Sequence, residues 1–192
     1  MTKFSGIILA AGDGLRFGKK KQFVKLKGKP IWKWSYDVAK KCLDEVVVVG
    51  VDFPGGRNRR ESVRIGLEHI TGDKVVIFDA SRPLVTEEQV ERIKEAVLEY
   101  PSVSFGITPS DTMFTLDYRW EREDLVALQV PQAFNTKMLK GAHKHNKRLK
   151  ATDDTILIYK KYDIMPHIIE GGINLHKLTY PEDLKIIKAL CE

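Results

Sequence analysis

Cysteine is scarce in this chain, and long apolar runs are absent. The 192 residues include two cysteines, Cys42 and Cys191, which lie far apart and lack the spacing of a metal site, so reduced, packed thiols are expected. No run approaches the length of a membrane span. The apolar segment from Phe4 to Ala11 is short, has no basic leader and ends in glycine, unlike a signal peptide. These absences predict a cytoplasmic protein that does not bind a membrane.

Linkers, low-complexity tracts and internal repeats are also absent, and a hydrophobic content of 43% suffices for one core but not for two. We therefore expect a single domain spanning residues 1–192. The net charge of +6 is compatible with nucleic acid, an anionic membrane surface or phosphorylated metabolites as partners. The lysines are spread along the chain, with one short cluster at Lys19–Lys21 and no basic stripe interleaved with aromatics. This distribution favours phosphorylated metabolites and argues against nucleic acid.

Apolar runs of strand length alternate with segments of helical periodicity. The sequence predicts strands at Phe4–Ala10, Glu45–Val51, Lys74–Phe78, Val103–Thr108, His167–Ile169 and Leu175–Leu178. It predicts helices at Ile31–Cys42, from Asn58 to Ile70, from Thr86 to Tyr100, at Asn135–Lys147, at Asp153–Lys161 and from Thr179 onward. Three of these helices are predicted to begin with a capping box, which pairs Asn58 with Glu61, Thr86 with Gln89 and Thr179 with Glu182. Such alternation indicates an α/β fold with a mainly parallel sheet, whose ligands gather beyond the carboxyl ends of the strands.

The segment 111–130 interrupts this alternation. Apolar residues at Met113–Leu116 and Val126–Leu128 flank a charged stretch and predict two antiparallel strands. An isolated hairpin is marginally stable in water. We therefore expect this arm to pack on a partner subunit.

A glycine-rich loop follows the first predicted strand. The run Ala10-Ala11-Gly12-Asp13-Gly14-Leu15-Arg16-Phe17-Gly18 leads directly into Lys19–Lys21. Small residues let the backbone approach a bulky ligand with its N–H groups exposed, and the cations suit a polyphosphate. The loop is not a dinucleotide fingerprint, because Gly18 comes one residue late, nor a P-loop, which ends in Gly-Lys-Ser/Thr. It indicates a nucleotide site of another class, with a flexible surface loop as the alternative.

Three further loops carry groups suited to phosphate chemistry. Residues 54–62 form a glycine turn before a predicted helix and hold three arginines, which can bind a base or phosphates. Asp79 and Arg82 follow a predicted strand, where a carboxylate suits a metal-bound phosphate and a guanidinium suits a second anion. A simple turn-forming role for Asp79 is the alternative. Lys177 lies where a strand is expected to meet a helix cap.

Together these stretches resemble the nucleotidyltransferases of the 2-C-methyl-D-erythritol 4-phosphate cytidylyltransferase family of the non-mevalonate isoprenoid route. The resemblance covers nearly the whole chain and rests on short motifs in a fixed order: Ala10-Ala11-Gly12 with Arg16 and Lys21-Gln22, Gly55-Gly56 with Arg59 and Ser62-Val63, Asp79-Ala80 with Arg82-Pro83, Asp111-Thr112-Met113, Pro131-Gln132, Thr152-Asp153, and Lys177-Leu178-Thr179 with Pro181-Glu182-Asp183. It implies a Rossmann-like, three-layer αβα fold of the nucleotide-diphospho-sugar transferase type, with a protruding β-hairpin arm.

The resemblance implies transfer of a cytidylyl group from CTP to 2-C-methyl-D-erythritol 4-phosphate, with release of pyrophosphate. The acceptor phosphate is already a nucleophile near neutral pH, which explains the lack of a Ser-His-Asp set and leaves charge neutralisation and in-line positioning to supply the catalysis. By resemblance, Arg16 and Lys21 stabilise the transition state, and Arg122 and Lys177 position the acceptor phosphate. The implied nucleotide-binding residues are Ala10, Ala11, Gly12, Gly56, Arg59, Ser62, Asp79 and Ala80, and the implied acceptor-binding residues are Arg82, Thr112, Arg122, Thr152 and Lys177.

The resemblance also implies a cofactor and a partner. Mg²⁺ is expected, held chiefly by triphosphate oxygens, with Asp79 as a candidate protein ligand. A homodimer is expected in which the hairpin arm, carrying Thr112 and Arg122, reaches into the neighbour's pocket.

Three features depart from the family pattern. The chain is much shorter between Val51 and Gly55, which predicts the loss of a strand–helix excursion and of one sheet strand. Arg57 stands where the family often has an acidic or amide residue, and it adds positive charge near the nucleotide. Val130 replaces a commoner threonine and removes a hydroxyl from the expected acceptor pocket, which bears on substrate identity.

Other functions and other roles stay open at this point. A ribitol 5-phosphate cytidylyltransferase is the close alternative, since both acceptors present a phosphate and several hydroxyls. An NAD-binding oxidoreductase would use Asp52 as the acid after its second strand, but the glycine spacing does not fit. A nucleic-acid binder is favoured by charge alone.

Several polar residues are interpreted as structural. His143 and His145 point about 200° apart on a predicted helix, so they cannot share a metal, and solvation at the surface is expected. Asp153 and Asp154 are interpreted as caps of the following helix.

Overall fold

A six-stranded sheet forms the centre of the protein. The computed structural model describes residues 1–114, 119–145 and 151–191, and its sheet has the order β10-β6-β9-β5-β1-β4. The strands are β1 (Phe4–Leu9), β4 (Glu45–Val49), β5 (Lys74–Asp79), β6 (Ser102–Ile107), β9 (Ala127–Asn135) and β10 (His167–Glu170). Strand β9 runs antiparallel to β5 and β6, whereas the other neighbours are parallel. The expected mainly parallel sheet is confirmed.

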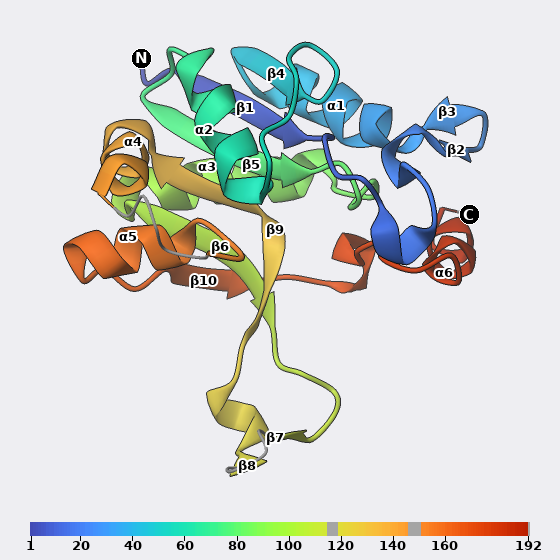
Figure 1. The fold of residues 1–192 in the computed structure, drawn as a ribbon. Helices are drawn as coiled ribbons and strands as arrows, with labels where there is room; N and C mark the ends of the chain where they lie inside the picture. Colours follow the sequence, from blue (N-terminus) through green and yellow to red (C-terminus); the bar gives the residue numbers. More distant parts are fainter. Residues whose placement is uncertain (115–118, 146–150, 192) are drawn as a thin grey trace.

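Helices cover both faces of this sheet (Figure 1). They are α1 (Ile31–Cys42), α2 (Arg59–Glu68), α3 (Glu87–Glu99), α4 (Thr136–His145) and α5 (Thr155–Tyr162). Helix α6 (Asp183–Ala189) lies to the side of the sheet and packs on the N-terminal loop (Figure 1). One apolar cluster joins α1 and α3 to the sheet through residues such as Ala39, Ile93 and Phe78. A second joins α2, α4 and α5 to the opposite face through residues such as Leu67 and Leu139. This is the expected three-layer αβα architecture.

The helix starts were predicted with mixed success. The capping box of Thr86 and Gln89 is present at α3. Asn58 accepts a hydrogen bond from the Glu61 amide, as predicted, but the Glu61 carboxylate accepts from the Arg57 amide and does not return to Asn58. The predicted capping box of Thr179 with Glu182 is wrong. Asp183 instead accepts hydrogen bonds from the amides of Thr179 and Tyr180, and α6 begins there.

Two other predictions need correction. The segment Leu175–Leu178 is not a strand: a single 3-10 turn, Ile173–Leu175, precedes an irregular stretch. Strand β9 was not predicted at its full length, and α4 follows it directly. The predicted end of that helix at Lys147 lies outside the described residues.

The arm projects away from the sheet (Figure 1). Its antiparallel pair is β7 (Met113–Phe114) with β8 (Arg119–Trp120). The prediction that Val126–Leu128 forms the second strand of this pair is therefore wrong, because β8 takes that place and Ala127 begins β9. The predicted strand end at Leu116 lies outside the described residues. Phe114 and Trp120 are exposed on this arm.

The sheet ends at β4, as the short connection after Val51 predicts. Among the described residues no further strand extends the sheet beyond β4. The connection instead folds back on the strand, since Asp52 Oδ2 accepts a hydrogen bond from the Val48 amide at 2.7 Å and Val48 O accepts from the Asp52 amide at 2.8 Å. Asp52 therefore closes the end of an edge strand, a role different from that of a ribose-binding acid.

A third apolar cluster ties the N-terminal loop to the C-terminal helix. It contains Phe17, Leu26, Ile31, Leu178 and Ile187. The small hairpin of β2 (Lys25–Leu26) and β3 (Lys29–Pro30) contributes to it. The glycine-rich loop thus rests on a packed base. In the described ranges, no helix combines the length and apolar character that crossing a bilayer requires.

Candidate functional site

A cavity of about 350 Å³ opens at the carboxyl ends of β1 and β5. Sequence-distant segments line it: the glycine-rich loop, the start of α2, the end of β5 and the segment before α6. The predicted site residues that line it are Ala10, Ala11, Gly12, Arg16, Lys21, Gly56, Arg59, Ser62, Asp79, Ala80 and Lys177. The fold therefore brings the predicted nucleotide-binding residues to one place, at the carboxyl ends of the strands, where parallel sheets bind their ligands.

The glycine-rich loop has a backbone that side chains would disrupt. Gly14 has a φ of 69°, and a Cβ atom there would lie 1.9 Å from the Lys19 carbonyl oxygen. The buried Gln22 donates from Nε2 to the Gly12 carbonyl at 3.0 Å. These contacts set the two 3-10 turns, η1 (Leu15–Phe17) and η2 (Lys21–Phe23), that carry Arg16 and Lys21.

A second glycine turn brings the start of α2 against this loop. A Cβ atom at Gly55 would lie 2.2 Å from the Cβ of Ala11, so glycine permits the close approach. The Gly56 amide donates to Ser62 Oγ at 3.1 Å, and Asn58 caps the helix. The positive end of the α2 dipole consequently lies beside the cavity, where it favours an anion.

Asp79 links two cations across the cavity. Its side chain is 9% exposed, Lys177 Nζ lies 2.7 Å from its Oδ2, and Arg59 Nε lies 3.6 Å from its Oδ1. Burial raises the pKa of this carboxyl, but the Lys177 and Arg59 charges outweigh burial and hold the pKa below its usual range. An ionised Asp79 thus fixes both cations, which a simple turn-forming role does not explain.

Further cations surround this carboxylate. Burial lowers the pKa of the Lys21 ammonium, and the Lys177 and Arg16 charges lower it further. Burial also lowers the pKa of Arg82, whose Nη1 donates to the Leu175 carbonyl. Like charges this close repel one another until an anion neutralises them. The electrostatics therefore suit a polyanionic ligand.

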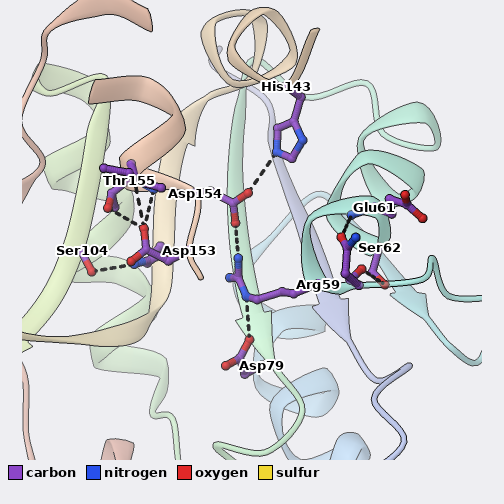
Figure 2. A network of polar contacts seen from close by, with 12 residues as sticks. Arg59, Glu61, Ser62, Asp79, Ser104, His143, Asp153, Asp154 and Thr155 are labelled. Atoms are coloured by element: carbon purple, nitrogen blue, oxygen red, sulfur yellow. Dashed lines mark hydrogen bonds and ion pairs between the residues drawn. The ribbon is translucent and has the colours of Figure 1, made fainter. Parts of the chain in front are cut away.

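A buried polar network continues from the cavity toward α4 and α5 (Figure 2). Arg59 Nη1 lies 2.5 Å from Asp154 Oδ2, and His143 Nε2 lies 3.0 Å from Asp154 Oδ1. The His143 and Asp154 side chains are 3% and 1% exposed. Burial raises the pKa of the Asp154 carboxyl, but Arg59 and His143 outweigh it and lower that pKa. Asp154 is therefore a buried carboxylate held between two donors.

This network corrects two predictions. His143 is not solvated at the surface, although His145 is exposed. Asp153 does cap α5, because its Oδ1 accepts from the Thr155 amide at 2.8 Å, but Asp154 makes no side-chain capping bond. Sequence reasoning missed His143 although one signal was available, because His143 shares the buried face of α4 with Leu139.

The predicted acceptor-binding residues other than Lys177 do not line the cavity: Arg82, Thr112, Arg122 and Thr152. Arg82 lies near enough to Asp79 for its charge to lower the pKa of that carboxyl. Thr152 is exposed before α5, and Thr112 is exposed on the arm. Arg122 Nη1 donates to the Ser110 carbonyl at 3.3 Å. Within one chain, the arm residues thus remain apart from the cavity.

The two residues that depart from the family pattern, Arg57 and Val130, lie in different surroundings. Arg57 is 89% exposed at the cavity rim, and its Nη2 lies 2.6 Å from Glu61 Oε1. Glu61 therefore offsets the positive charge that Arg57 was expected to add. Val130 is buried in β9 and does not line the cavity.

Metal ligands are few around the cavity. In the part of the chain that the structure describes, no three His, Cys, Asp or Glu side chains are grouped to hold a metal ion. Asp79 lines the cavity as a buried carboxylate, and both of its oxygens face cations. A divalent cation in the cavity would therefore take most of its ligands from a bound phosphate compound.

Comparison with known proteins gives a consistent result. The family model described as 2-C-methyl-D-erythritol 4-phosphate cytidylyltransferase matches residues 51–192, and that of the MobA-like NTP transferase domain matches residues 6–61. A 2-C-methyl-D-erythritol 4-phosphate cytidylyltransferase from Clostridium botulinum is 33% identical over 229 aligned positions, which cover 100% of this chain and 99% of the relative. A relative of the same name from Aquifex aeolicus is 32% identical, and the alignment covers 98% of this chain and 99% of the relative.

A solved structure supports the same grouping. The crystal structure of 2-C-methyl-D-erythritol 4-phosphate cytidylyltransferase from Thermus thermophilus superposes with a TM-score of 0.84 at 27% identity, and covers 98% of both chains. The 229 positions aligned with the Clostridium relative exceed the 192 residues of this chain, which agrees with the loss of a segment.

Proposed function

The chain belongs to the 2-C-methyl-D-erythritol 4-phosphate cytidylyltransferase family, and on that premise we propose that it transfers a cytidylyl group from CTP to 2-C-methyl-D-erythritol 4-phosphate in isoprenoid precursor biosynthesis. One observation carries the proposal: Arg16 and Lys21 from the glycine-rich loop, and Lys177 from the distant segment before α6, line one cavity beside the α2 N-terminus. Such a set of cations suits a triphosphate and a phosphomonoester. Family membership disfavours the oxidoreductase alternative, and Asp52 is engaged with β4.

In the reaction, an oxygen of the acceptor phosphate attacks the α-phosphorus of CTP. A new P–O bond forms, the bond from the α-phosphorus to the bridging oxygen breaks, and the electron pair leaves with pyrophosphate. Because the attacking oxygen is already ionised, no general base is required. Arg16 and Lys21 neutralise charge that develops on the phosphates, and Lys177, held by Asp79, positions the acceptor phosphate.

The remaining lining residues are assigned to the nucleotide. Gly12 and Gly56 line the cavity, and a residue without a side chain leaves its backbone open to a bulky ligand. We assign nucleotide binding to lining residues: Ala10, Ala11, Gly12, Gly56, Arg59, Ser62, Asp79 and Ala80. We assign acceptor binding to Lys177, which also lines the cavity, and, by family resemblance alone, to Arg82, Thr112, Arg122 and Thr152.

Mg²⁺ is the proposed cofactor. The donor set fits an ion held mainly by triphosphate oxygens, with Asp79 as the nearby protein carboxylate. Such an ion would supply additional neutralisation of the triphosphate charge.

A homodimer is the proposed assembly, with a cytoplasmic location where CTP is available. The exposed Phe114 and Trp120 on the projecting arm support a packing partner. Arg122 and Thr112 would then complete the pocket of the neighbouring subunit, since they do not reach the cavity of their own chain.

Pyrophosphate release with matched acceptors tests the proposal. Wild-type protein with CTP and Mg²⁺ should turn over 2-C-methyl-D-erythritol 4-phosphate, and should show little turnover with ribitol 5-phosphate or with ATP, GTP or UTP in place of CTP. Turnover with ribitol 5-phosphate alone would replace the acceptor. No release with any acceptor would refute the function.

A further inference from the structure

A buried pair behind the cavity acts on one of its lining residues. We infer that His143 and Asp154 are positioning residues for nucleotide binding, which hold the Arg59 guanidinium in the orientation in which Arg59 lines the cavity. The inference rests on the proposed function, because it takes the nucleotide to be the occupant of the cavity.

The contacts of Arg59 with two carboxylates show why its orientation matters. A guanidinium has five N–H donors in a rigid fork. Nη1 lies 2.5 Å from Asp154 Oδ2 and Nε lies 3.6 Å from Asp79 Oδ1, which fixes the plane of the group between two carboxylates. Nη2 is buried and has no hydrogen-bond partner in the described ranges. The contacts with Asp154 and Asp79 therefore determine how the group is oriented.

Asp154 can hold Arg59 in this way only if it is itself held. Its carboxylate is buried, and a buried charge requires partners that satisfy its oxygens. Arg59 meets Oδ2, and His143 meets Oδ1 at 3.0 Å when its Nε2 carries the proton. Removing the His143 donor would leave one oxygen unsatisfied and free the carboxylate to turn.

Neither His143 nor Asp154 touches the cavity. His143 belongs to α4 and Asp154 directly precedes α5 (Figure 2). Neither residue lines the cavity, whereas Arg59 does. An effect of the His143 imidazole on nucleotide binding would therefore pass through its partner Asp154 to Arg59. This separates a positioning role from direct contact with the substrate.

Steady-state kinetics and CTP binding test the inference with three variants. His143→Leu removes the donor, His143→Gln retains an amide donor near the Nε2 position, and His145→Leu is the matched control on the exposed side of the same helix. His143→Leu should raise the Kd and KM for CTP about tenfold, as expected for one lost hydrogen bond to a charged group, while the KM for the acceptor stays unchanged. His143→Gln should recover most of the affinity, and His145→Leu should match the wild type.

A double-mutant cycle with Arg59→Lys completes the test, because a lysine has no fork to orient. In the Arg59→Lys background, His143→Leu should cause no further loss of CTP affinity. An equal loss in both backgrounds would overturn the inference, as would a His143→Leu variant with a lower melting temperature but wild-type CTP affinity. If His143→Leu does not fold, His143→Asn, whose shorter amide does not reach Asp154, takes its place. Failure of the wild type to bind CTP would refute the proposed function together with the inference.

Discussion

At the residue scale, the cavity is a cluster of cations that repel one another in the ligand-free protein. The lowered pKa of Lys21 records its burial and the charges of Lys177 and Arg16 nearby. Asp79 offsets part of this charge. The site is therefore arranged for an anionic ligand at the expense of ligand-free stability.

Lys21→Ala should separate function from stability. Turnover should fall by about 100-fold, because the charge proposed to stabilise the transition state is removed. The ligand-free melting temperature should stay equal or rise, because a like-charge repulsion is relieved. The measurements are pyrophosphate release and thermal melting, with the exposed neighbour Lys20→Ala as the control. Wild-type turnover in Lys21→Ala would remove this lysine from the mechanism.

Glu45 gives a prediction for stability against pH. Burial raises its pKa, but hydrogen bonds from Ser5 and Thr71 outweigh burial and lower the pKa from 4.5 to about 2. A lowered pKa adds stability that is present above pH 4.5 and is lost as pH falls toward 2. Glu45→Gln should therefore reduce the free energy of unfolding by about 1–2 kcal/mol at neutral pH.

The decisive measurement is how the difference in unfolding free energy between the wild type and Glu45→Gln depends on pH. Denaturant titrations of both proteins should converge as pH falls from 4.5 toward 2. The exposed Glu95→Gln serves as the control and should follow the wild type. A difference that does not change with pH would contradict the account.

Single residues were predictable where local chemistry alone determines the role. The place of the glycine-rich loop at the cavity was predictable, because its glycines and its cations lie in one short segment, and Gly12, Arg16 and Lys21 line the cavity. Asp154 was misread as a cap because it precedes an apolar run. Its actual partners, Arg59 and His143, belong to other elements. The local sequence around Asp154 does not show that these three residues contact one another in the fold.

At the element scale, the shortened connection after β4 is stabilised by its own residues. The edge of a sheet exposes unpaired backbone groups that favour association. Asp52 occupies one of them through its bond to the Val48 amide. The turn therefore compensates for a strand that the sequence no longer provides.

Asp52→Ala should reduce the free energy of unfolding by about 1 kcal/mol, because the Val48 amide loses its acceptor. Asp52→Asn keeps an acceptor oxygen and should recover most of that loss. CTP affinity should be unchanged in both variants, since Asp52 does not line the cavity. Urea titration and CTP binding provide the measurements. A loss of nucleotide affinity in both variants would restore a ligand-binding role for Asp52.

Elements with uniform patterns were predictable, and β9 was not. The β-branched runs of β1, β4 and β5 are typical of buried strands. Strand β9 contains Pro131, which argues against an inner strand. The structure accommodates it at an irregularity, because the pairing of β6 with β9 passes from Ser104–Gln132 to Phe105–Gln129 and leaves Val130 and Pro131 out of register. Only the folded sheet reveals that compensation.

At the scale of the whole molecule, the arm separates residues that the proposed reaction needs together. Lys177 lines the cavity, whereas Arg122 is on the arm and donates a hydrogen bond to the Ser110 carbonyl of its own chain. A second subunit would bring another Arg122 to each cavity. The site is then shared between subunits.

A hybrid dimer tests this sharing. Arg122→Ala and Lys177→Ala should each be inactive as homodimers. A hybrid purified through two different tags has one cavity with an intact Lys177 and an intact Arg122 from its neighbour, so it should regain about half of the wild-type activity. The readout is pyrophosphate release. An inactive hybrid would show that each chain supplies both residues to its own cavity.

The most direct test of the central claim is a crystal structure of the protein with CTP and Mg²⁺. The account predicts that the triphosphate lies in the cavity at the ends of β1 and β5, contacted by Arg16 and Lys21, with Lys177 facing the α-phosphate from the acceptor side. A triphosphate bound elsewhere, or these three cations facing away from it, would contradict the account.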